Sequence, residues 1–282
     1  MQHPFQVTHL SFDLGEQSHS NSRNNMAYSE SKIEVPHHIR HNETVGAGLS
    51  SWVHRLNAVA KCYSSTEKSA RAREIAVYKR LGSAAWHPGI LRFYGILDEQ
   101  CVVLQFAEHG SIRHYLGQGQ QSRCRRIPLT TKLRWAEQAA DAIAFLHTNN
   151  VFHCDISCNN IFLDQNLNAM VGDFAGSSLD GAQCLSWYET SHSHPDMMDP
   201  SPKSELFALG STFYEIVEGK RPFEGLEEMA IQESFRDGLL PDLESLPLGN
   251  VIAKCWRQEY ETCELRPSCA QGKINWLFQS PS

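Results

Sequence analysis

The chain has 282 residues, of which 41% are hydrophobic and 20% are charged, and its formal net charge is −7 at pH 7. This composition is ordinary for a folded globular protein, and the length allows one large or two small domains with a substantial core. The negative balance argues against nucleic acid or an anionic membrane surface as the main partner. We find no apolar run as long as a membrane-spanning helix and no secretory signal, so we expect no membrane insertion.

The nine cysteines show no regular spacing, and their number is odd. This pattern argues against a disulfide framework and favours reduced thiols, so we expect an intracellular, cytoplasmic protein. Cys154, Cys158 and Cys184 could in principle bind a metal ion. Because no second closely spaced pair accompanies them, buried apolar thiols are the favoured interpretation.

Residues 1–40 form a segment rich in Ser, Asn, Gln and His, without sustained hydrophobic periodicity. Such a segment cannot bury enough apolar surface to offset the entropy of ordering it. We therefore predict a polar, disordered tail over 1–40, followed by one folded domain over 41–282.

The first part of the folded domain is predicted to be rich in strands. Gly46 and Gly48 lie in a turn, where glycine lets a backbone approach phosphate oxygens without obstruction by a Cβ atom. Lys61 then projects from an otherwise apolar strand, a position where a lysine usually just faces solvent. A helix with Ser and Thr at its start follows. The predicted elements are a glycine-containing turn at 45–53, a strand at 58–63, a helix at 66–81, and strands at 91–97 and 101–106.

The second part is predicted to be mainly helical. A helix over 130–148 carries an apolar stripe along one face, and another apolar helix covers 204–217. Between these two helices lies the segment His153–Gly176, which holds most of the side chains suited to chemistry.

This segment is predicted to form a loop, a short apolar strand, a turn and a second strand. Asp155, Asn160 and Asp173 stand at the ends of the strand-turn-strand unit, which brings their side chains to one edge. Carboxylate and amide oxygens held in this way suit Mg²⁺, which completes its shell with substrate phosphates. A carboxylate that is not needed for the metal can accept a proton from an incoming hydroxyl.

The segment resembles the catalytic loop and the metal-binding motif of the eukaryotic protein kinases. The family pattern H-x-D-x-x-x-x-N is matched by His153, Asp155 and Asn160, and D-F-x is matched by Asp173 and Phe174. Further matches extend the resemblance from Val45 to about Phe278. They are the glycine-rich loop at 45–53 (with Ser51 for the third glycine), the strand lysine Lys61, the helix glutamate Glu74, the triplet 194–196, Glu205 with Gly210, the turn 219–223, and Arg266, which is expected to pair with Asp196.

The resemblance implies an α+β, bilobal protein-kinase fold. Residues 41–107 would form an N-lobe with a small antiparallel β-sheet and one helix. Residues 108–282 would form a mainly α-helical C-lobe, with ATP bound between the two lobes.

The resemblance also implies roles for five catalytic residues. Lys61 would hold the α- and β-phosphates of ATP and would itself be held by Glu74. Asn160 and Asp173 would bind Mg²⁺, and Asp155 would orient and deprotonate the acceptor hydroxyl.

Binding of ATP would use the glycine-rich loop over the phosphates, the backbone of Gln105 and Ala107 at the adenine edge, and apolar side chains on the two faces of the adenine. The implied ATP-binding residues are Val45, Gly46, Ala47, Gly48, Val53, Ala60, Lys61, Gln105, Ala107 and Phe162. Four further residues resemble the stack that links the two lobes of an active kinase: Tyr78, Phe93, His153 and Phe174.

The implied function is that of an ATP-dependent protein kinase, with ATP and a protein substrate as partners. Serine or threonine is favoured over tyrosine as the acceptor because serine/threonine kinases are the larger group. Cys154 and Ser157 replace the usual arginine and lysine of the loop, and Ala175 replaces the glycine of D-F-G, which is costly if the backbone there is left-handed. The alternative is therefore a pseudokinase, a nucleotide-binding or scaffold module without phosphotransfer. The oligomeric state is left open.

Cys154 also bears on control, because a neutral thiol cannot pair with a phosphate as arginine does. We therefore predict that basal activity does not depend on phosphorylation of the segment 177–194. The alternative is that Arg71 or Arg73 takes over the role of the missing arginine. The possible phosphate acceptors in the segment are Ser186, Tyr188 and Thr190.

Overall fold

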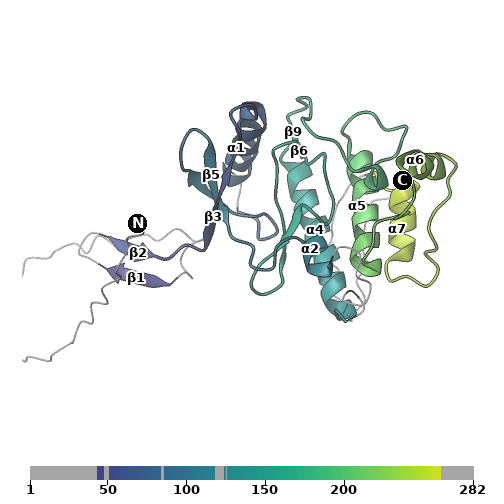
Figure 1. Cartoon of the computed structure of the whole chain (residues 1–282), viewed down its shortest axis with the longest axis horizontal. Helices are drawn as coiled ribbons and strands as arrows, with labels where there is room; N and C mark the ends of the chain where they lie inside the picture. Colours follow the sequence, from purple (N-terminus) through teal and green to yellow (C-terminus); the bar gives the residue numbers. More distant parts are fainter. Residues whose placement is uncertain (1–42, 48–50, 84–85, 118–123, 125, 262–282) are drawn as a thin grey trace, which may run out of the picture. The chain divides into compact units, whose positions relative to one another are not determined.

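The computed structural model describes residues 43–47, 51–83, 86–117, 124 and 126–261 (Figure 1). The predicted tail, Gly48 and Arg266 lie outside these residues. The chain divides into two compact units, residues 1–56 and 57–282. In the first unit, β1 (Thr44–Ala47) and β2 (Trp52–His54) form an antiparallel hairpin, in which Gly46 is opposite Val53.

The second unit begins with a three-stranded antiparallel sheet in the order β3–β5–β4. Its strands are β3 (Ala58–Cys62), β4 (Phe93–Ile96) and β5 (Cys101–Gln105). Lys61 is paired in register with Val102, and Val59 with Leu104. Because residues directly opposite each other in an antiparallel pair lie on the same face, Lys61 and Val59 share the face of Val102 and Leu104, which are buried.

One helix, α1 (Lys68–Ser83), lies between β3 and β4 in the chain. Its sequence is rich in Ala, Arg and Lys, which favour a helix. Ile75, Tyr78 and Leu81 are buried, and the ring of Tyr78 stacks on that of Phe93 in β4. The helix begins and ends two residues later than predicted, which is within the usual uncertainty of helix ends.

The rest of the second unit is mainly helical. Two helices have clear stop and start signals: α2 ends at Gly117, which has a left-handed backbone, and Ser201 caps the start of α5. No helix of the described residues is long and apolar enough to cross a membrane. The helices are α2 (Ile112–Leu116), α4 (Leu129–Thr148), α5 (Pro202–Glu218), α6 (Glu228–Arg236) and α7 (Gly249–Trp256), with a 3-10 turn η2 (Thr190–His192).

Four short strands complete the second unit. β6 (Val151–Phe152) pairs with β9 (Ser178–Leu179), and β7 (Ile161–Leu163) pairs with β8 (Ala169–Val171). The strand-turn-strand unit predicted from the sequence is therefore present, and β6–β9 adds a pairing across the predicted loop.

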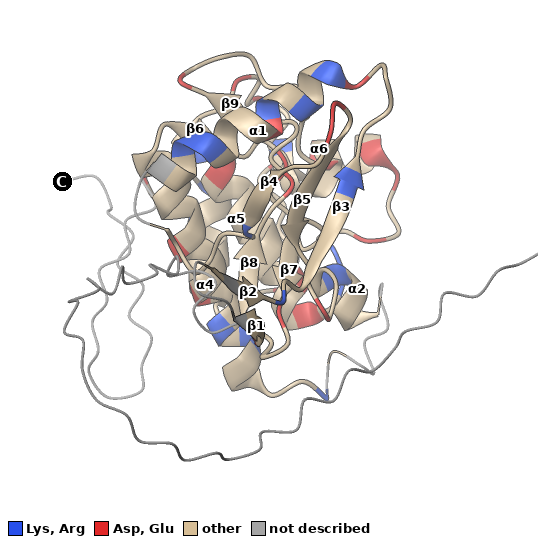
Figure 2. Ribbon diagram, turned by 90° about the vertical axis from the view of Figure 1, so that its left-hand side faces the viewer, with Lys and Arg blue, Asp and Glu red and all other residues tan. Residues whose placement is uncertain are grey.

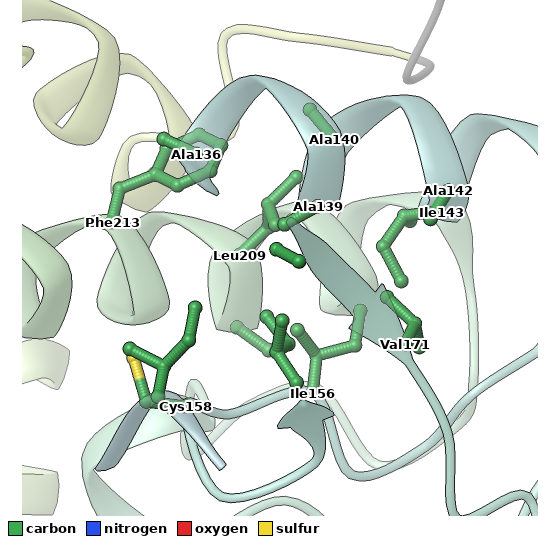
Figure 3. Packing of buried hydrophobic residues seen from close by; sticks show 14 of the residues in the cluster. Ala136, Ala139, Ala140, Ala142, Ile143, Ile156, Cys158, Val171, Leu209 and Phe213 are labelled. Carbon is green, nitrogen blue, oxygen red and sulfur yellow. The ribbon is translucent and has the colours of Figure 1, made fainter. Parts of the chain in front are cut away.

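The core lies between α4, α5 and the segment that follows α4 (Figure 3). Ala136 of α4 lies beside Phe213 of α5, and both are fully buried, as are Ala140 and Leu209 of the same cluster. Small side chains on one helix let the other approach closely, and each buried leucine or phenylalanine contributes roughly 1.5–3 kcal/mol. Ile156 packs in the same cluster, so the predicted catalytic loop rests directly on the core.

Cys62 and Cys101 form a disulfide between β3 and β5, which corrects the expectation that all the cysteines are reduced. The two residues are 39 positions apart in sequence, but sheet register places them directly opposite each other, with Cα atoms 4.1 Å apart. The disulfide removes the argument that reduced thiols made for an intracellular location. Cys154 and Cys158 are free and buried, as expected, whereas Cys184 is free and partly exposed.

Candidate active site

The predicted catalytic loop, which begins at His153, is held by Glu205, a fully buried residue of α5. Its carboxylate accepts hydrogen bonds from the backbone N–H groups of His153 and Cys154, each at 2.9 Å. The ring of His147 lies 3.4 Å away, and the hydroxyl of Tyr188 donates at 2.5 Å. Burial acts to raise the pKa of Glu205, but the imidazoles of His147 and His153 and the hydrogen bond from Tyr188 outweigh it, so the pKa lies below its usual value.

Asp155 lies in this loop, and Asn160 fixes it from the end of the loop. The side-chain amide of Asn160 donates to the carbonyl of Asp155 at 2.7 Å and to its carboxylate at 2.9 Å. Burial raises the pKa of Asp155, with His153 and Asn160 acting against the shift. A carboxylate with a raised pKa is a stronger proton acceptor than an exposed aspartate.

Lys61, Glu74 and Asp173 are brought together from β3, α1 and the end of β8. The ammonium nitrogen of Lys61 is 3.0 Å from Glu74 Oε1 and 2.7 Å from Asp173 Oδ1. Glu74 is fully buried and also accepts the N–H of Phe174 at 3.2 Å. The residue with a left-handed backbone here is Asp173, at φ 63°, and not Ala175, so alanine in place of the D-F-G glycine carries no such cost.

Four aromatic residues form one continuous stack beside these charged groups. Tyr78 stacks on Phe93 and meets Phe174 edge-on, with ring centroids 5.1 Å apart in both pairs. Phe174 in turn contacts His153 at 5.4 Å, and Nε2 of His153 donates to the carbonyl of Gly172. The stack joins α1 and the sheet to the catalytic loop, at the residues where the sequence resemblance places it.

The residues expected at the adenine lie on several elements, and their role in binding ATP stays a prediction. Ala60 lies on the opposite face of β3 from Lys61, so Val59 is the small apolar residue that shares the face of Lys61. The alternation of side chains along β3 is the pattern in the sequence that indicates Val59, and not Ala60, on the face of Lys61. Phe162 of β7 is half-buried against the core, and Gln105 ends β5 with its N–H bonded to the carbonyl of Arg92. Of the other expected ATP-binding residues, Ala107 follows β5, and Val45, Gly46, Ala47 and Val53 belong to the β1–β2 hairpin.

The segment after β8 is tied to α1 by arginines, and Figure 2 shows basic segments along this helix. Arg73 donates to the backbone carbonyls of Ser177 and Gln183. Arg80 binds the carboxylate of Asp180 with both terminal nitrogens, at 2.8 and 2.5 Å. Arg73 therefore reaches the segment 177–194, but its partners there are backbone carbonyl oxygens. That an α1 arginine takes over the role of the missing arginine stays a prediction.

Tyr188, one of the three possible phosphate acceptors, is buried with its hydroxyl bonded to Glu205. Arg71, the other arginine considered, donates to the carbonyl of Asp98, which lies outside the segment. Asp196, whose expected partner is outside the described residues, lies 3.6 Å from Arg236 of α6.

An ion-pair network around Arg113 was not predicted from the sequence. Arg113 of α2 binds Glu215 of α5 with two nitrogens, at 2.7 and 2.8 Å, and Glu189 with a third at 2.5 Å. Burial lowers the pKa of nearby His192 to about 4, so its ring is neutral at pH 7. No local pattern indicates these contacts, because Arg113 and Glu215 are 102 residues apart.

Comparison with known proteins agrees with this geometry. A family model described as protein tyrosine and serine/threonine kinase matches residues 52–271. The chain is 25% identical over 199 residues to serine/threonine/tyrosine-protein kinase HT1 of Arabidopsis thaliana, covering 66% of this chain and 49% of that protein. It is 26% identical over 205 residues to human tyrosine-protein kinase FRK, covering 66% and 39%.

A third relative, human serine/threonine-protein kinase A-Raf, is 29% identical over 178 residues, covering 57% of this chain and 28% of that protein. The chain spans less than half the length of each of these relatives. The family match covers most of the chain and confirms both the resemblance and the α+β kinase fold. This chain therefore belongs to the protein tyrosine and serine/threonine kinase family.

Proposed function

We propose that this chain is an active, ATP-dependent protein kinase, which transfers the γ-phosphate of ATP to a hydroxyl group of a protein substrate. The observation that supports the proposal best is the position of Lys61 between Glu74 and Asp173, next to a loop in which Asn160 holds Asp155. Phosphoryl transfer asks a protein chiefly for positioning and for stabilisation of charge, and each charged group needed for this is present.

Asn160 and Asp173 fit the binding of Mg²⁺. The nitrogen of the Asn160 amide faces Asp155, which leaves the amide oxygen as the atom that can bind a metal. The carboxylate of Asp173 is partly exposed and supplies further oxygens of the hard type that Mg²⁺ prefers. When bound there, Mg²⁺ would offset the negative charge of the phosphates.

Lys61 would act on the nucleotide, and Asp155 would act on the acceptor hydroxyl. Lys61 would donate hydrogen bonds to the α- and β-phosphates and so position ATP. Asp155 would accept a hydrogen bond from the acceptor hydroxyl and take its proton as the new O–P bond forms and the bond to the β-phosphate oxygen breaks. The hydrogen bonds from the N–H groups of His153 and Cys154 to Glu205 would help to position this loop during the step.

An assay with radiolabelled ATP tests the proposal directly. Wild type and Lys61→Met are compared on a mixture of generic acceptor proteins, each with Mg²⁺ and with a chelator. Wild type is expected to transfer label only with Mg²⁺. Lys61→Met, which lacks the hydrogen-bond donor for the phosphates, is expected to be at least about a hundredfold slower.

Two outcomes of this assay separate the alternatives. If wild type binds nucleotide but transfers no label, the chain is the binding or scaffold module of the pseudokinase alternative. If label is transferred, phosphoamino-acid analysis of the product gives the acceptor, for which we propose serine or threonine. Phosphotyrosine as the main product would contradict that part of the proposal.

We further propose that transfer does not depend on phosphorylation of the segment 177–194. Ser186→Ala combined with Thr190→Ala is expected to change kcat/KM by no more than a few-fold, because Arg73 and Arg80 already bind the segment without a phosphate. A loss of about a hundredfold, or about 2.7 kcal/mol of transition-state stabilisation, in a folded variant that binds ATP would contradict this. Tyr188 is left intact because its hydroxyl bonds to Glu205.

A further inference from the structure

We propose that Tyr63 is a positioning residue of the active site, which fixes the carboxylate of Glu74 so that Glu74 holds Lys61 while nucleotide is bound. The inference rests on the proposed function, because it concerns the same site. Tyr63 directly follows β3 and stands two residues after Lys61. The kinase motifs that this chain matches assign no role to this position.

The contacts around Glu74 divide its two oxygens between different donors. Oε1 accepts from Lys61 at 3.0 Å and from the N–H of Phe174 at 3.2 Å. Oε2 accepts from the hydroxyl of Tyr63, and in the described part of the chain it has no other hydrogen-bond donor. The ring of Tyr63 also lies near the ammonium group of Lys61, which is 5.2 Å from the ring centroid.

Burial makes the hydroxyl of Tyr63 important to Glu74. The Glu74 side chain is fully buried, and a buried carboxylate oxygen without a partner is costly. Burial and the hydrogen bond with Glu74 raise the pKa of Tyr63, so its hydroxyl keeps its proton and remains a donor at neutral pH. Without this donor, the carboxylate can lower its energy by turning Oε2 toward Lys61 or Phe174, which disturbs the geometry at Oε1.

The need for this support increases when nucleotide binds. Lys61 is now held by two carboxylates, and Asp173 is the closer one at 2.7 Å. The oxygens of Asp173 are the ones proposed to bind Mg²⁺, and a metal there would compete with Lys61 for them. Glu74 would then be the carboxylate that keeps Lys61 directed at the phosphates, and its orientation depends on Tyr63.

Tyr63→Phe in the full chain tests the inference, because phenylalanine keeps the ring and removes only the hydroxyl. We expect kcat/KM for ATP to fall about tenfold while KM for the protein acceptor stays within about twofold. Tyr94→Phe is the matched control, since it removes the hydroxyl of a tyrosine in β4 that has no hydrogen bond with Glu74. The control is expected to behave as wild type.

A double-mutant cycle distinguishes positioning from a general structural effect. Glu74→Gln alone should lower kcat/KM for ATP, and adding Tyr63→Phe to Glu74→Gln should cause no further loss if Tyr63 acts through Glu74. The inference is overturned if Tyr63→Phe alone changes kcat/KM for ATP by less than about twofold. It is also overturned if the effects of the two substitutions multiply.

The same cycle is measured in the binding of a fluorescent ATP analogue with Mg²⁺, which does not require phosphoryl transfer. If wild type binds the analogue but transfers no phosphate, the proposed function fails, and an affinity loss in Tyr63→Phe that disappears in the Glu74→Gln background still supports the role of Tyr63. Failure of wild type to bind the analogue overturns the inference together with the proposed function.

Discussion

Asp155→Ala is expected to lower kcat by about a thousandfold and to leave the affinity for ATP within a few-fold of wild type. The carboxylate of Asp155 is held by Asn160 in the catalytic loop and has no contact with Lys61 among the described residues. Its loss removes the proposed proton acceptor but none of the groups proposed to bind the phosphates. Steady-state transfer rates and equilibrium binding of nucleotide measure the two effects separately.

The pH dependence of transfer gives a second check on Asp155. Burial raises its pKa above the usual value, and the base acts only when it is deprotonated. The wild-type kcat is therefore expected to fall as the pH drops through this raised pKa, at a higher pH than for an exposed aspartate. Asp199→Ala, at an exposed aspartate, is the control and should keep the wild-type rate. An Asp155→Ala variant that loses less than about tenfold in kcat would show that Asp155 is not the base.

Glu205→Ala is expected to lower the free energy of unfolding by about 3–5 kcal/mol. The substitution leaves the buried N–H groups of His153 and Cys154 without their acceptor, and each unsatisfied buried donor costs about 1–3 kcal/mol. It also removes the 2.5 Å hydrogen bond of the Tyr188 hydroxyl, whose other partner is Ser204 Oγ at 3.3 Å. Denaturant unfolding of wild type and variant measures the difference. A loss below about 1 kcal/mol would show that the carboxylate does not hold the loop.

Two further variants make the Glu205 result specific. Glu205→Asp keeps the carboxylate on a shorter stem and is expected to lose less stability than Glu205→Ala, because some of the donors remain within reach. Glu228→Ala, at an exposed residue of α6, should stay within about 0.5 kcal/mol of wild type.

Stability is also expected to depend on pH through Glu205. Its pKa in the folded protein lies below the usual value of 4.5, so its contribution is present above that value and is lost as the pH falls through the folded pKa. Glu205→Gln should therefore lose less stability than wild type when the pH is lowered through this range. His147, His153 and Tyr188 face the carboxylate and remain unchanged in this comparison.

The sequence by itself determined the family, the fold and the elements that carry the site. The strand-turn-strand unit between Asn160 and Asp173 is local, so the spacing of its residues reports its geometry directly. The apolar stripe of 130–148 likewise predicted α4, which spans Leu129–Thr148. Glu74 depended on resemblance alone, because one glutamate on a helix forms no pattern. The alternation of side chains along β3 was enough to predict that Val59 shares a face with Lys61, although Ala60 was the residue expected at the adenine.

Only the tertiary structure decided which side chains meet across the chain. Arg80 and Asp180 are 100 residues apart, as are Phe174 and Glu74, and the disulfide joins Cys62 to a cysteine 39 residues away. Periodicity in a sequence shows which face of an element is buried, but it does not show what lies opposite that face. Tyr63 donates a hydrogen bond to Glu74, and Tyr188 donates one to Glu205. Both bonds exist because separate elements pack into one core and place a donor beside a buried carboxylate.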